Sequence, residues 1–234
     1  MISYNIDRIV SIQEVLNVRE NQASRGLSIQ AIHRLPYYLQ YLRQLAQQGT
    51  ETISAPAVAA HFRLSEIQVR KDFAAVSTNA GKPRSGFPVH GLIRDMEQFL
   101  GYGNVNEAVL VGAGSLGQAL MCYGGFTDYG LEIIAAFDCD PAKIGTEIHG
   151  KHILPADKIT DLCRRMNVPM GIITVPASQA QLICNALVEG GVRGIWNFAP
   201  VHLSAPEHVL VQNENMAASL ALLSKHLYRD TGEE

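Results

Sequence analysis

The sequence predicts an α/β protein of two domains, and three observations lead to this prediction. The 234 residues are comfortable for two domains, since domains usually hold about 100 to 150 residues. The first 90 residues show apolar residues at helical spacing, whereas the chain from Glu107 onward alternates short β-rich runs with helical stretches. Residues 1–90 contain ten Lys and Arg against six Asp and Glu, a balance of +4, while the remainder contains nine against sixteen, a balance of −7. This difference in charge indicates that the first part binds phosphate groups and that the second part has another function.

An extension precedes the first predicted domain. The extension comprises residues 1–28, of which residues 1–26 show apolar residues at helical spacing and then turn polar through ENQASRG, which predicts a short helix and a linker. A further helix is expected over residues 31–48, where apolar residues recur every three or four positions and Gly49 ends the pattern. Pro36 is expected near the first turn of that helix, the part of a helix in which proline is tolerated.

Two more short helices follow closely. Ser54 can cap a helix over APAVAAHF, and Ser65 can cap a third helix over EIQVRKDFAAV. Ser65 and Gln68 together form a capping box. A tight turn around Arg63 joins the two helices. Three short helices with such a turn between the last two are typical of a helix-turn-helix module.

A segment rich in glycine and proline, TNAGKPRSGFPV, comes after the third helix. Gly81 and Gly86 permit backbone turns, and Lys82 and Arg84 stand at the tip. We interpret this segment as a basic hairpin wing. The first domain is therefore expected to be a winged-helix domain over residues 29–90.

The second half predicts a parallel sheet. Its β-rich runs are AVLVG, LEIIAAFD, GIITVP, GIWNFA and HVLVQ, and the stretches between them are long enough for crossover helices. A Rossmann-type, doubly wound sheet with helices on both faces is expected over residues 91–212, and a helix over residues 90–100 is expected to bridge the two halves. Residues 213–234 carry leucines at helical spacing and are expected to form a C-terminal helix that packs against a partner subunit.

The clearest motif is a glycine-rich loop between the first predicted strand and helix of the second domain. It comprises Gly112, Ala113, Gly114, Ser115, Leu116 and Gly117. In this GxGxxG pattern Gly112 permits a tight turn, Gly114 lets the backbone approach a pyrophosphate, and Gly117 lets helix and strand pack closely. The start of the following helix supplies N–H groups for phosphate. The loop predicts a dinucleotide site.

An acidic residue ends the next predicted strand. Asp138 lies 21 residues after Gly117 (138 minus 117), near the spacing expected for a carboxylate that binds the ribose. Because no basic residue stands directly beside Asp138 in the sequence, we expect NAD(H) rather than NADP(H). The alternative is a carboxylate that starts a helix, a role that Asp140 and Pro141 fit better.

Two later strand ends are expected to line the nicotinamide side of the site. They contribute Thr174, Val175, Pro176 and Asn197. Ligands of such sheets bind outside the carboxyl ends of the strands. Each run could also be an ordinary strand end.

The sequence offers no convincing catalytic residue. A dehydrogenase needs an acid or base beside the nicotinamide, and no histidine forms a recognisable dyad with a carboxylate. No cluster of metal ligands stands out either. We therefore expect a protein that is not an enzyme.

The cysteines and apolar runs bear on the compartment. Cys122, Cys139, Cys163 and Cys184 include no CxxC pair, so we expect buried thiols in a reducing compartment, with redox sensing as the alternative. No apolar run approaches the roughly 18 residues of a membrane span, and the start lacks the pattern of a signal peptide. A cytoplasmic protein without a membrane partner is expected.

The first domain carries polar and basic residues where a recognition helix and a wing meet DNA. They are Ser65, Gln68, Arg70, Lys71, Lys82 and Arg84. Arginine can bond guanine in a bidentate fashion, glutamine can read adenine, and lysine can neutralise phosphate. A solvated helix face is the alternative, since adjacent basic residues are common. The basic wing favours double-stranded DNA.

Taken together, the motifs RLPYYLQYL, QVRKDF, the glycine-bearing wing, GAGSLG, FDCDPAKIG, TVPA and NFAP resemble, in this order, the Rex family of redox-sensing transcriptional repressors. The resemblance runs from about Ile32 to Tyr228. It implies a homodimer that binds an inverted-repeat operator and exchanges its C-terminal helices. It also implies that NADH binding releases the operator, whereas NAD+ competes weakly. By this matching Tyr123 lies near the nicotinamide, and Arg70 and Lys71 belong to the DNA-reading helix.

The chain departs from the family pattern at several positions. The family usually has an arginine at the position of Gln40 and an aspartate at that of Asn215, and these two form a charged link between its two arrangements. A neutral pair would bond more weakly by about 1 kcal/mol, which is on the order of a typical allosteric coupling. The wing is less aromatic, and residues 1–28 have no matching segment. We expect a related protein with altered regulation.

Two other functions stay open at this point. One is an NAD-dependent oxidoreductase with an accessory domain, against which the missing acid or base counts. The other is a DNA-binding repressor that has lost its nucleotide response, which Gln40 and Asn215 favour and the intact glycine-rich loop opposes.

Overall fold

The computed structural model describes residues 27–78, 86–104 and 106–230, which form two compact units. The first unit is Met1–Gly103 and the second is Asn104–Glu234. The expected helix in residues 1–26 and the wing residues Gly81, Lys82 and Arg84 lie outside the described residues.

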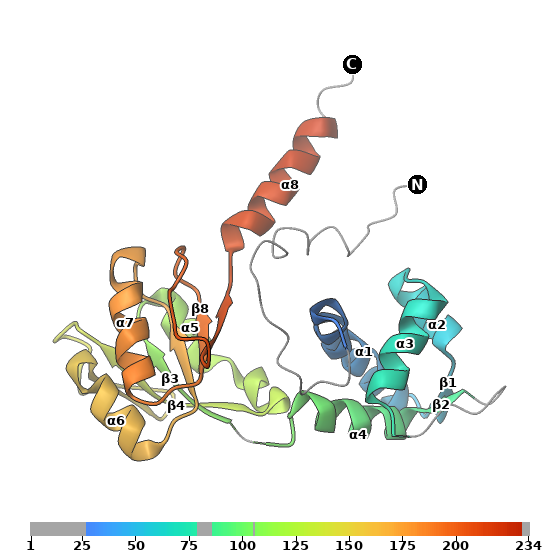
Figure 1. Cartoon of the computed structure of the whole chain (residues 1–234), viewed down its shortest axis with the longest axis horizontal. Coiled ribbons are helices and arrows are strands. Elements are labelled where there is room, and N and C mark those ends of the chain that lie inside the picture. The colour runs from blue at the N-terminus through green and yellow to red at the C-terminus, as the bar shows by residue number, and fades with distance from the viewer. Residues whose placement is uncertain (1–26, 79–85, 105, 231–234) are drawn as a thin grey trace. The chain divides into compact units, whose positions relative to one another are not determined.

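The first unit contains four helices and a two-stranded sheet in its described part (Figure 1). The helices are α1 (Ile29–Gln47), α2 (Ala55–Phe62), α3 (Glu66–Val76) and α4 (Val89–Leu100), and the strands are β1 (Thr52–Ile53) and β2 (Phe87–Pro88). Leu35, Leu39 and Leu42 repeat at the spacing of one face of α1 and are at most 1% exposed. They pack with Phe73 of α3 and Met96 of α4 in one core. The three predicted helices of this region are confirmed.

Serine caps set where these helices begin. The hydroxyl of Ser54 accepts a hydrogen bond from the Ala57 N–H at 3.3 Å, as predicted. Ser28 caps α1 in the same way, accepting from the Ala31 N–H at 3.2 Å. Because this cap lies upstream of the expected start, Pro36 stands inside α1 and not near its first turn. The prediction for Pro36 was wrong.

The wing strand pairs differently from a simple hairpin. β2 pairs antiparallel with β1, with Ile53 opposite Phe87, so its partner lies before α2 in the sequence. Gly86 has a φ of +74°, and a Cβ there would lie 2.5 Å from the carbonyl oxygen of Ile53. The turn role predicted for Gly86 is therefore confirmed.

The helix after the wing belongs to the first unit. α4 begins at Val89, and Val89, Leu92 and Met96 are buried in the core of that unit. Arg43 of α1 donates to Glu97 of α4 at 2.8 Å. The units consequently divide at residues 103 and 104, and not at residue 90 as expected, because α4 buries its apolar face with α1 and α3.

The second unit is built on a seven-stranded sheet in the order β5-β6-β4-β3-β7-β8-β9. The strands are β3 (Asn106–Val111), β4 (Leu131–Asp138), β5 (Glu147–Ile148), β6 (Lys151–Pro155), β7 (Met170–Ile173), β8 (Gly194–Asn197) and β9 (Leu210–Asn213). All neighbouring pairs are parallel except β5 with β6. The chain moves outward from β3 in both directions, so the strand order reverses between β3 and β7, the place where doubly wound sheets bind ligands. The predicted parallel sheet is confirmed.

Helices cover both faces of this sheet. They are α5 (Ser115–Cys122), α6 (Ile159–Met166) and α7 (Ala177–Glu189), with short 3₁₀ helices at Gly124–Tyr129 and Ala156–Lys158. Ala108 and Leu110 of β3 pack in the cluster that contains Met121 of α5. Val109 and Val111 point the other way, into the cluster with residues of α6 and α7, which lie side by side in Figure 1. The alternation along β3 is the two-residue period of a strand buried on both faces.

The C-terminal helix α8 (Met216–Asp230) follows β9, as expected. Its Met216, Leu220 and Leu223 are each at least 60% exposed. None of the helices in the described part of the chain is both long and apolar enough to cross a membrane.

Candidate nucleotide site and DNA-reading helix

The three glycines between β3 and α5 have different surroundings. Gly112 has a φ of +104°, and a Cβ there would lie 2.9 Å from the carbonyl oxygen of Thr174. A Cβ on Gly117 would overlap the carbonyl oxygen of Gly112. Gly114 has extended backbone, and none of the described atoms lies within 4 Å of a Cβ added to it. The fold itself thus requires Gly112 and Gly117, while the space beside Gly114 leaves room for a ligand.

The start of α5 faces this open space. Gly114 is its N-cap and has no side chain to satisfy the first N–H groups, those of Ser115, Leu116 and Gly117. Such groups, together with the helix dipole, favour a phosphate. The N–H of Ala113 is already bound to Asp138. The backbone N–H groups of residues 115–117 therefore face the open space beside Gly114.

Asp138 lies at the end of β4 and is 7% exposed. One carboxylate oxygen accepts from the Ala113 N–H at 2.8 Å and from Lys143 Nζ at 3.0 Å, and the other accepts from the Asp140 N–H at 2.9 Å. Burial raises the pKa of Asp138, but the hydrogen bonds from Asp140, Lys143 and Ala113 outweigh it and lower the pKa below its usual range. The carboxylate stays ionised and holds the glycine-rich loop against β4.

Folding brings a basic residue onto Asp138, although none stands directly beside it in the sequence. Lys143 follows by five positions, in the turn after β4, and folding brings its ammonium group onto the carboxylate. The side chain of Lys143 is 33% exposed. The position expected to meet the ribose thus carries an acid paired with a lysine.

The other predicted nucleotide residues take two kinds of position. The hydroxyl of Thr174 donates to the carbonyl oxygens of Val111 at 3.0 Å and Gly112 at 2.8 Å, so it holds the glycine-rich loop. Val175 is half-buried beside it, and Pro176 is exposed where it caps α7. These three residues follow the carboxyl end of β7, and the fourth, Asn197, ends β8.

Asn197 is fully buried, and its amide is used within the protein. Nδ2 donates to the carbonyl oxygens of Val201 at 2.9 Å and Ala199 at 3.2 Å and to Asn213 Oδ1 at 2.8 Å. Oδ1 accepts from the Ala199 N–H at 3.0 Å. The Asn197 side chain therefore shapes the loop after β8.

Tyr123 stands at the far end of α5 from the glycine-rich loop, about 12 Å away for an eight-residue helix. It is 56% exposed and packs edge-on against Phe126, with ring centroids 4.8 Å apart. Phe126 in turn packs against Trp196 at 5.7 Å. Tyr123 thus begins an aromatic row that reaches β8.

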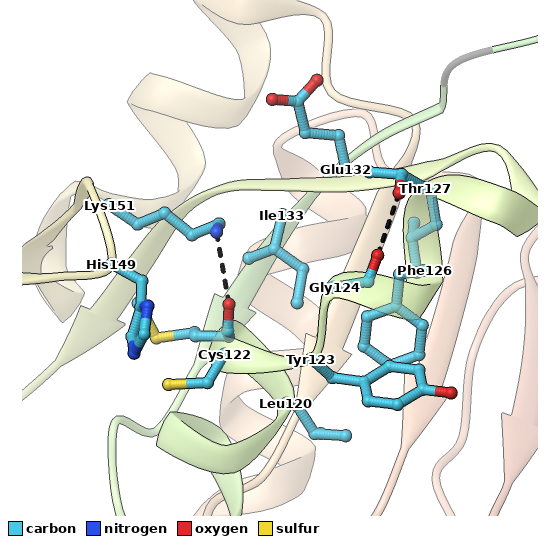
Figure 2. A pocket seen from close by; sticks show the side chains of 12 residues that line it. Leu120, Cys122, Tyr123, Gly124, Phe126, Thr127, Glu132, Ile133, His149 and Lys151 are labelled. Atoms are coloured by element: carbon cyan, nitrogen blue, oxygen red, sulfur yellow. Dashed lines mark hydrogen bonds between the residues drawn. The ribbon is translucent and has the colours of Figure 1, made fainter.

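A pocket of about 260 Å³ opens beside Tyr123 (Figure 2). Cys122, Phe126, His149 and Lys151 also line it, and Lys151 Nζ donates to the carbonyl oxygen of Met121 at 3.2 Å. The lining contains no residue of the glycine-rich loop. This pocket is therefore separate from the start of α5.

In the first unit, Asp72 of α3 binds one of the predicted DNA-reading residues, Gln68. Its carboxylate is 1% exposed and accepts from Arg34 Nε at 2.8 Å and from Arg34 Nη2 at 3.0 Å. The Tyr38 hydroxyl and Gln68 Nε2 also donate to it, each at 3.0 Å. Burial lowers the pKa of Arg34, but the hydrogen bond and charge of Asp72 outweigh it and raise the pKa. Burial and the neighbouring Asp72 likewise raise the pKa of Tyr38.

The predicted capping box is only half formed. The Ser65 hydroxyl accepts from the Gln68 N–H at 3.1 Å, which confirms the cap. The Gln68 side chain turns to Asp72 and does not return to Ser65. Sequence reasoning missed Asp72 and Arg34, although the spacing of four residues between Gln68 and Asp72 was a local signal for their contact.

The exposed face of α3 carries its basic residues. Arg70 is 65% exposed and pairs with Glu66 one turn earlier, and Lys71 is exposed beside it. Ile67 on the same face is 68% exposed. Lys82 and Arg84 lie outside the described residues, so the described part of the predicted DNA-binding surface comes from α3.

The cysteines do not all behave as expected. Cys163 and Cys184 are buried, and burial raises the pKa of Cys163 to about 11 and also raises that of Cys184. Cys122 and Cys139 are exposed, so the expectation of four buried thiols was wrong for these two. They sit at element ends, where no apolar face covers them. Within the described residues no group of His, Cys, Asp and Glu could hold a metal ion.

Family models match both units. A model described as the CoA binding domain matches residues 104–201, and one described as the putative DNA-binding protein N-terminus matches residues 26–74. Among solved structures, the Rex-family repressor RSP in complex with β-NAD+ and operator DNA is similar with a TM-score of 0.83 and 28% identity, covering 87% of this chain and 94% of that one. RSP in complex with β-NADH gives a TM-score of 0.79 at 28% identity and covers 88% of this chain and 96% of that one.

Curated relatives extend over most of the chain. The redox-sensing transcriptional repressor Rex of Treponema denticola is 39% identical over 82% of this chain and 91% of that protein. The protein of the same name from Bacteroides thetaiotaomicron is 37% identical over 84% of this chain and 89% of that protein. That from Carboxydothermus hydrogenoformans is 39% identical over 85% of this chain and 95% of that protein. With a nucleotide-type loop in one unit, a basic helix-turn-helix in the other and this identity along both, the chain belongs to the Rex family of redox-sensing transcriptional repressors.

Proposed function

We propose that this chain is a DNA-binding transcriptional repressor that releases its operator when NADH binds to the second unit. The observation that carries the nucleotide part is the glycine-rich loop, in which open space stands beside Gly114 and the unsatisfied start of α5 follows. RSP binds NADH in one structure and both NAD+ and operator DNA in another. Because the relatives are repressors, family membership supports a sensor and not an enzyme.

The nucleotide would be held at three places. The backbone of residues 114–117 would bind the pyrophosphate, and Asp138 would accept from a ribose hydroxyl by exchanging its contact with Lys143. The strand ends with Thr174, Val175 and Pro176, and the loop shaped by Asn197, would border the nicotinamide. Tyr123 would reach the nicotinamide from the other end of α5, as the family resemblance implies.

DNA would meet the exposed face of α3. Arg70 and Lys71 would contact bases or phosphates there, with Ser65 and Gln68 at the start of the helix and Lys82 and Arg84 on the wing. The structure supports Ser65 as a helix cap more directly than as a base contact, because its hydroxyl already accepts from the Gln68 N–H.

The partners follow from this assignment. A homodimer would read an inverted-repeat operator, since two recognition helices then meet equivalent half-sites. The exposed apolar residues of α8 would contact the second subunit, with exchange of the C-terminal helices. A repressor of this kind acts in the cytoplasm, where its DNA is.

The strength of the switch rests on Gln40 and Asn215. Gln40 is exposed on α1, and Asn215 Oδ1 accepts from the Ala218 N–H at 3.0 Å, which caps α8. A neutral residue at each position removes a charge-assisted link and would weaken the coupling between nucleotide and DNA. These two residues favour a second candidate function, a repressor of retained fold that has lost its nucleotide response.

Titration of a protein–operator complex with NADH, NAD+ and NADPH at fixed salt tests the proposal. The full chain would first select its operator from a random-sequence duplex library. Release by NADH at concentrations where NAD+ leaves the complex intact is expected. Tight DNA binding that ignores all three nucleotides would favour the second candidate. Failure to select any duplex would overturn DNA binding itself.

A further inference from the structure

The side-chain amide of Gln68 is held in one orientation by a buried carboxylate. Asp72, one helical turn after Gln68, accepts from Gln68 Nε2 at 3.0 Å. A carboxylate only accepts, so it selects the nitrogen of the amide and turns the oxygen away. Hydrogen-bond partners are what distinguish the two ends of an amide, and here the partner is unambiguous.

Asp72 is itself fixed by every bond it makes. Oδ1 accepts from Arg34 Nη2 and Gln68 Nε2, and Oδ2 accepts from Arg34 Nε and the Tyr38 hydroxyl. Each oxygen therefore has two donors, which matches its two lone pairs. The Arg34 side chain is 6% exposed, so this network is shielded from water. Rotation of the carboxylate would break several charge-assisted bonds at once.

The backbone of Gln68 is fixed as well. Its N–H donates to the Ser65 hydroxyl at 3.1 Å, at the capped start of α3. Gln68 is half-buried and stands three residues before the exposed Lys71, at the edge of the basic face of α3. Both ends of this residue are thus anchored before any ligand arrives.

The amide oxygen of Gln68 remains available. Within the described residues no buried side-chain oxygen or nitrogen lacks a partner, and the contacts of Gln68 include none to Oε1. Oε1 therefore reaches solvent at the edge of the face that carries Arg70 and Lys71. In the major groove, the groups that donate to such an oxygen are the exocyclic amines, N6 of adenine and N4 of cytosine.

We propose that Gln68 reads an exocyclic amine of the operator through Oε1, and that Asp72, held by Arg34 and Tyr38, is the positioning residue that sets this preference. The proposal rests on the proposed function, since it requires that α3 enters the major groove. It makes the buried network a determinant of sequence preference as well as of stability. Guanine and thymine, whose O6 and O4 would face Oε1, are disfavoured at that base.

A base-analogue scan of a selected operator tests the reading. Each adenine is replaced by purine, and each cytosine by 2-pyrimidinone, so that one exocyclic amine is lost at a time. We expect one position per half-site at which the full-length wild type loses roughly fivefold in affinity, the value of one net hydrogen bond, while the Gln68→Ala variant loses nothing further. Gln47→Ala, an exposed glutamine at the end of α1, is the matched control and should keep the wild-type pattern.

Two outcomes would overturn the proposal. One is a scan in which no amine position depends on Gln68. The other is dependence on a guanine O6 or thymine O4 instead, detected with 2-aminopurine or 5-methyl-2-pyrimidinone, because Oε1 cannot pair with an acceptor. A wild type that selects no duplex would instead remove the proposed function, so the two failures are distinguishable.

The positioning role has a separate readout. Asp72→Ala leaves Arg34 buried without its partner and can fail to fold, so the double variant Arg34→Met/Asp72→Leu removes both charges together. With the anchor gone, the Gln68 amide can turn over. We expect affinity at the Gln68-dependent base to become nearly equal for all four bases, with preferences elsewhere unchanged. An unchanged preference at that base would show that Asp72 does not set it.

Discussion

Two buried carboxylates, one in each unit, stand at the centre of the candidate binding elements and are satisfied in different ways. Asp72 accepts only from side chains, those of Arg34, Tyr38 and Gln68, which come from two helices. Asp138 accepts from two backbone N–H groups and from Lys143, which is partly exposed. The bonds of Asp72 join two helices of the core, whereas those of Asp138 hold the glycine-rich loop and the turn after β4. The first carboxylate fixes the start of α3, and the second fixes the glycine-rich loop.

Removal of Asp72 has the largest expected effect on stability. Asp72→Ala leaves the Arg34 guanidinium buried without an acceptor, and such a change costs about 3–5 kcal/mol. Denaturation followed by circular dichroism and by fluorescence of Trp196, the chain's one tryptophan, separates the units because Trp196 lies in the second. We expect the helical signal to be lost at a lower denaturant concentration than in the wild type, while the midpoint of the fluorescence transition stays unchanged. Asp157→Ala, at a side chain 71% exposed, is the control and should unfold like the wild type. If the two variants unfold at the same denaturant concentration, Asp72 does not stabilise the first unit as expected.

Gly114→Ala should separate ligand binding from folding. The extended backbone of Gly114 accepts alanine and the added Cβ meets no described atom, so the melting temperature should stay at the wild-type value. The Cβ would instead occupy the space in which a pyrophosphate approaches, and NADH affinity should fall tenfold or more, about 1.4 kcal/mol. Gly103→Ala, another glycine with open space around it, is the matched control. Calorimetric titration with NADH measures the effect. An unchanged affinity would show that NADH does not bind at the glycine-rich loop.

Asp138→Asn tests how the contribution of the second carboxylate to stability depends on pH. The pKa of Asp138 is lowered in the folded protein, so its contribution to stability is present above the unfolded value of about 3.9 and is lost as pH falls through the folded value. The melting temperature of the wild type should exceed that of Asp138→Asn near neutral pH, and the gap should close below about pH 4. Thermal unfolding from pH 2.5 to 7 measures it, with the exposed Asp161→Asn as control. A gap independent of pH would show that the hydrogen bonds to Asp138 do not depend on its charge.

The smallest effect is expected on the exposed face of α3. Glu66 pairs with Arg70 in the absence of DNA and competes with phosphate for it. Glu66→Gln should raise affinity for any duplex about twofold, since exposed pairs of this kind contribute roughly 0.3–0.5 kcal/mol. Fluorescence anisotropy with specific and random duplexes measures the change. A gain confined to the operator would indicate that Arg70 reads a base instead of a phosphate.

Local patterns in the sequence predicted much of this architecture. The spacing of leucines in α1, the serine caps at Ser54 and Ser65, and the alternation of strands and helices each depend on residues close in the chain. The glycine-rich loop was likewise recognisable because all its parts lie within six residues. These features are set by short-range geometry.

The features that the sequence did not predict depend on contacts that form only when the chain folds. β6 was missed because KHILP is short and begins with two polar residues, and it becomes a strand by pairing with β4. The Arg34–Asp72 pair joins residues 38 positions apart, which no local spacing reveals. Lys143 lay only five positions after Asp138, but the turn that brings them together was not predicted. Start positions were also imprecise, as Pro36 shows, because Ser28 caps α1 earlier than expected.

Trp196 gives the second unit an optical reporter. Its indole N–H donates to Glu214 Oε1 at 2.9 Å, just before α8, and its ring belongs to the aromatic row that begins at Tyr123. Reduced nicotinamide absorbs where tryptophan emits, and the oxidised ring does not. Resonance energy transfer from this single indole would therefore register the redox state of a bound nucleotide without any added dye. Because the indole N–H of Trp196 bonds to Glu214, two residues before α8, the emission of Trp196 would also register movement of that helix.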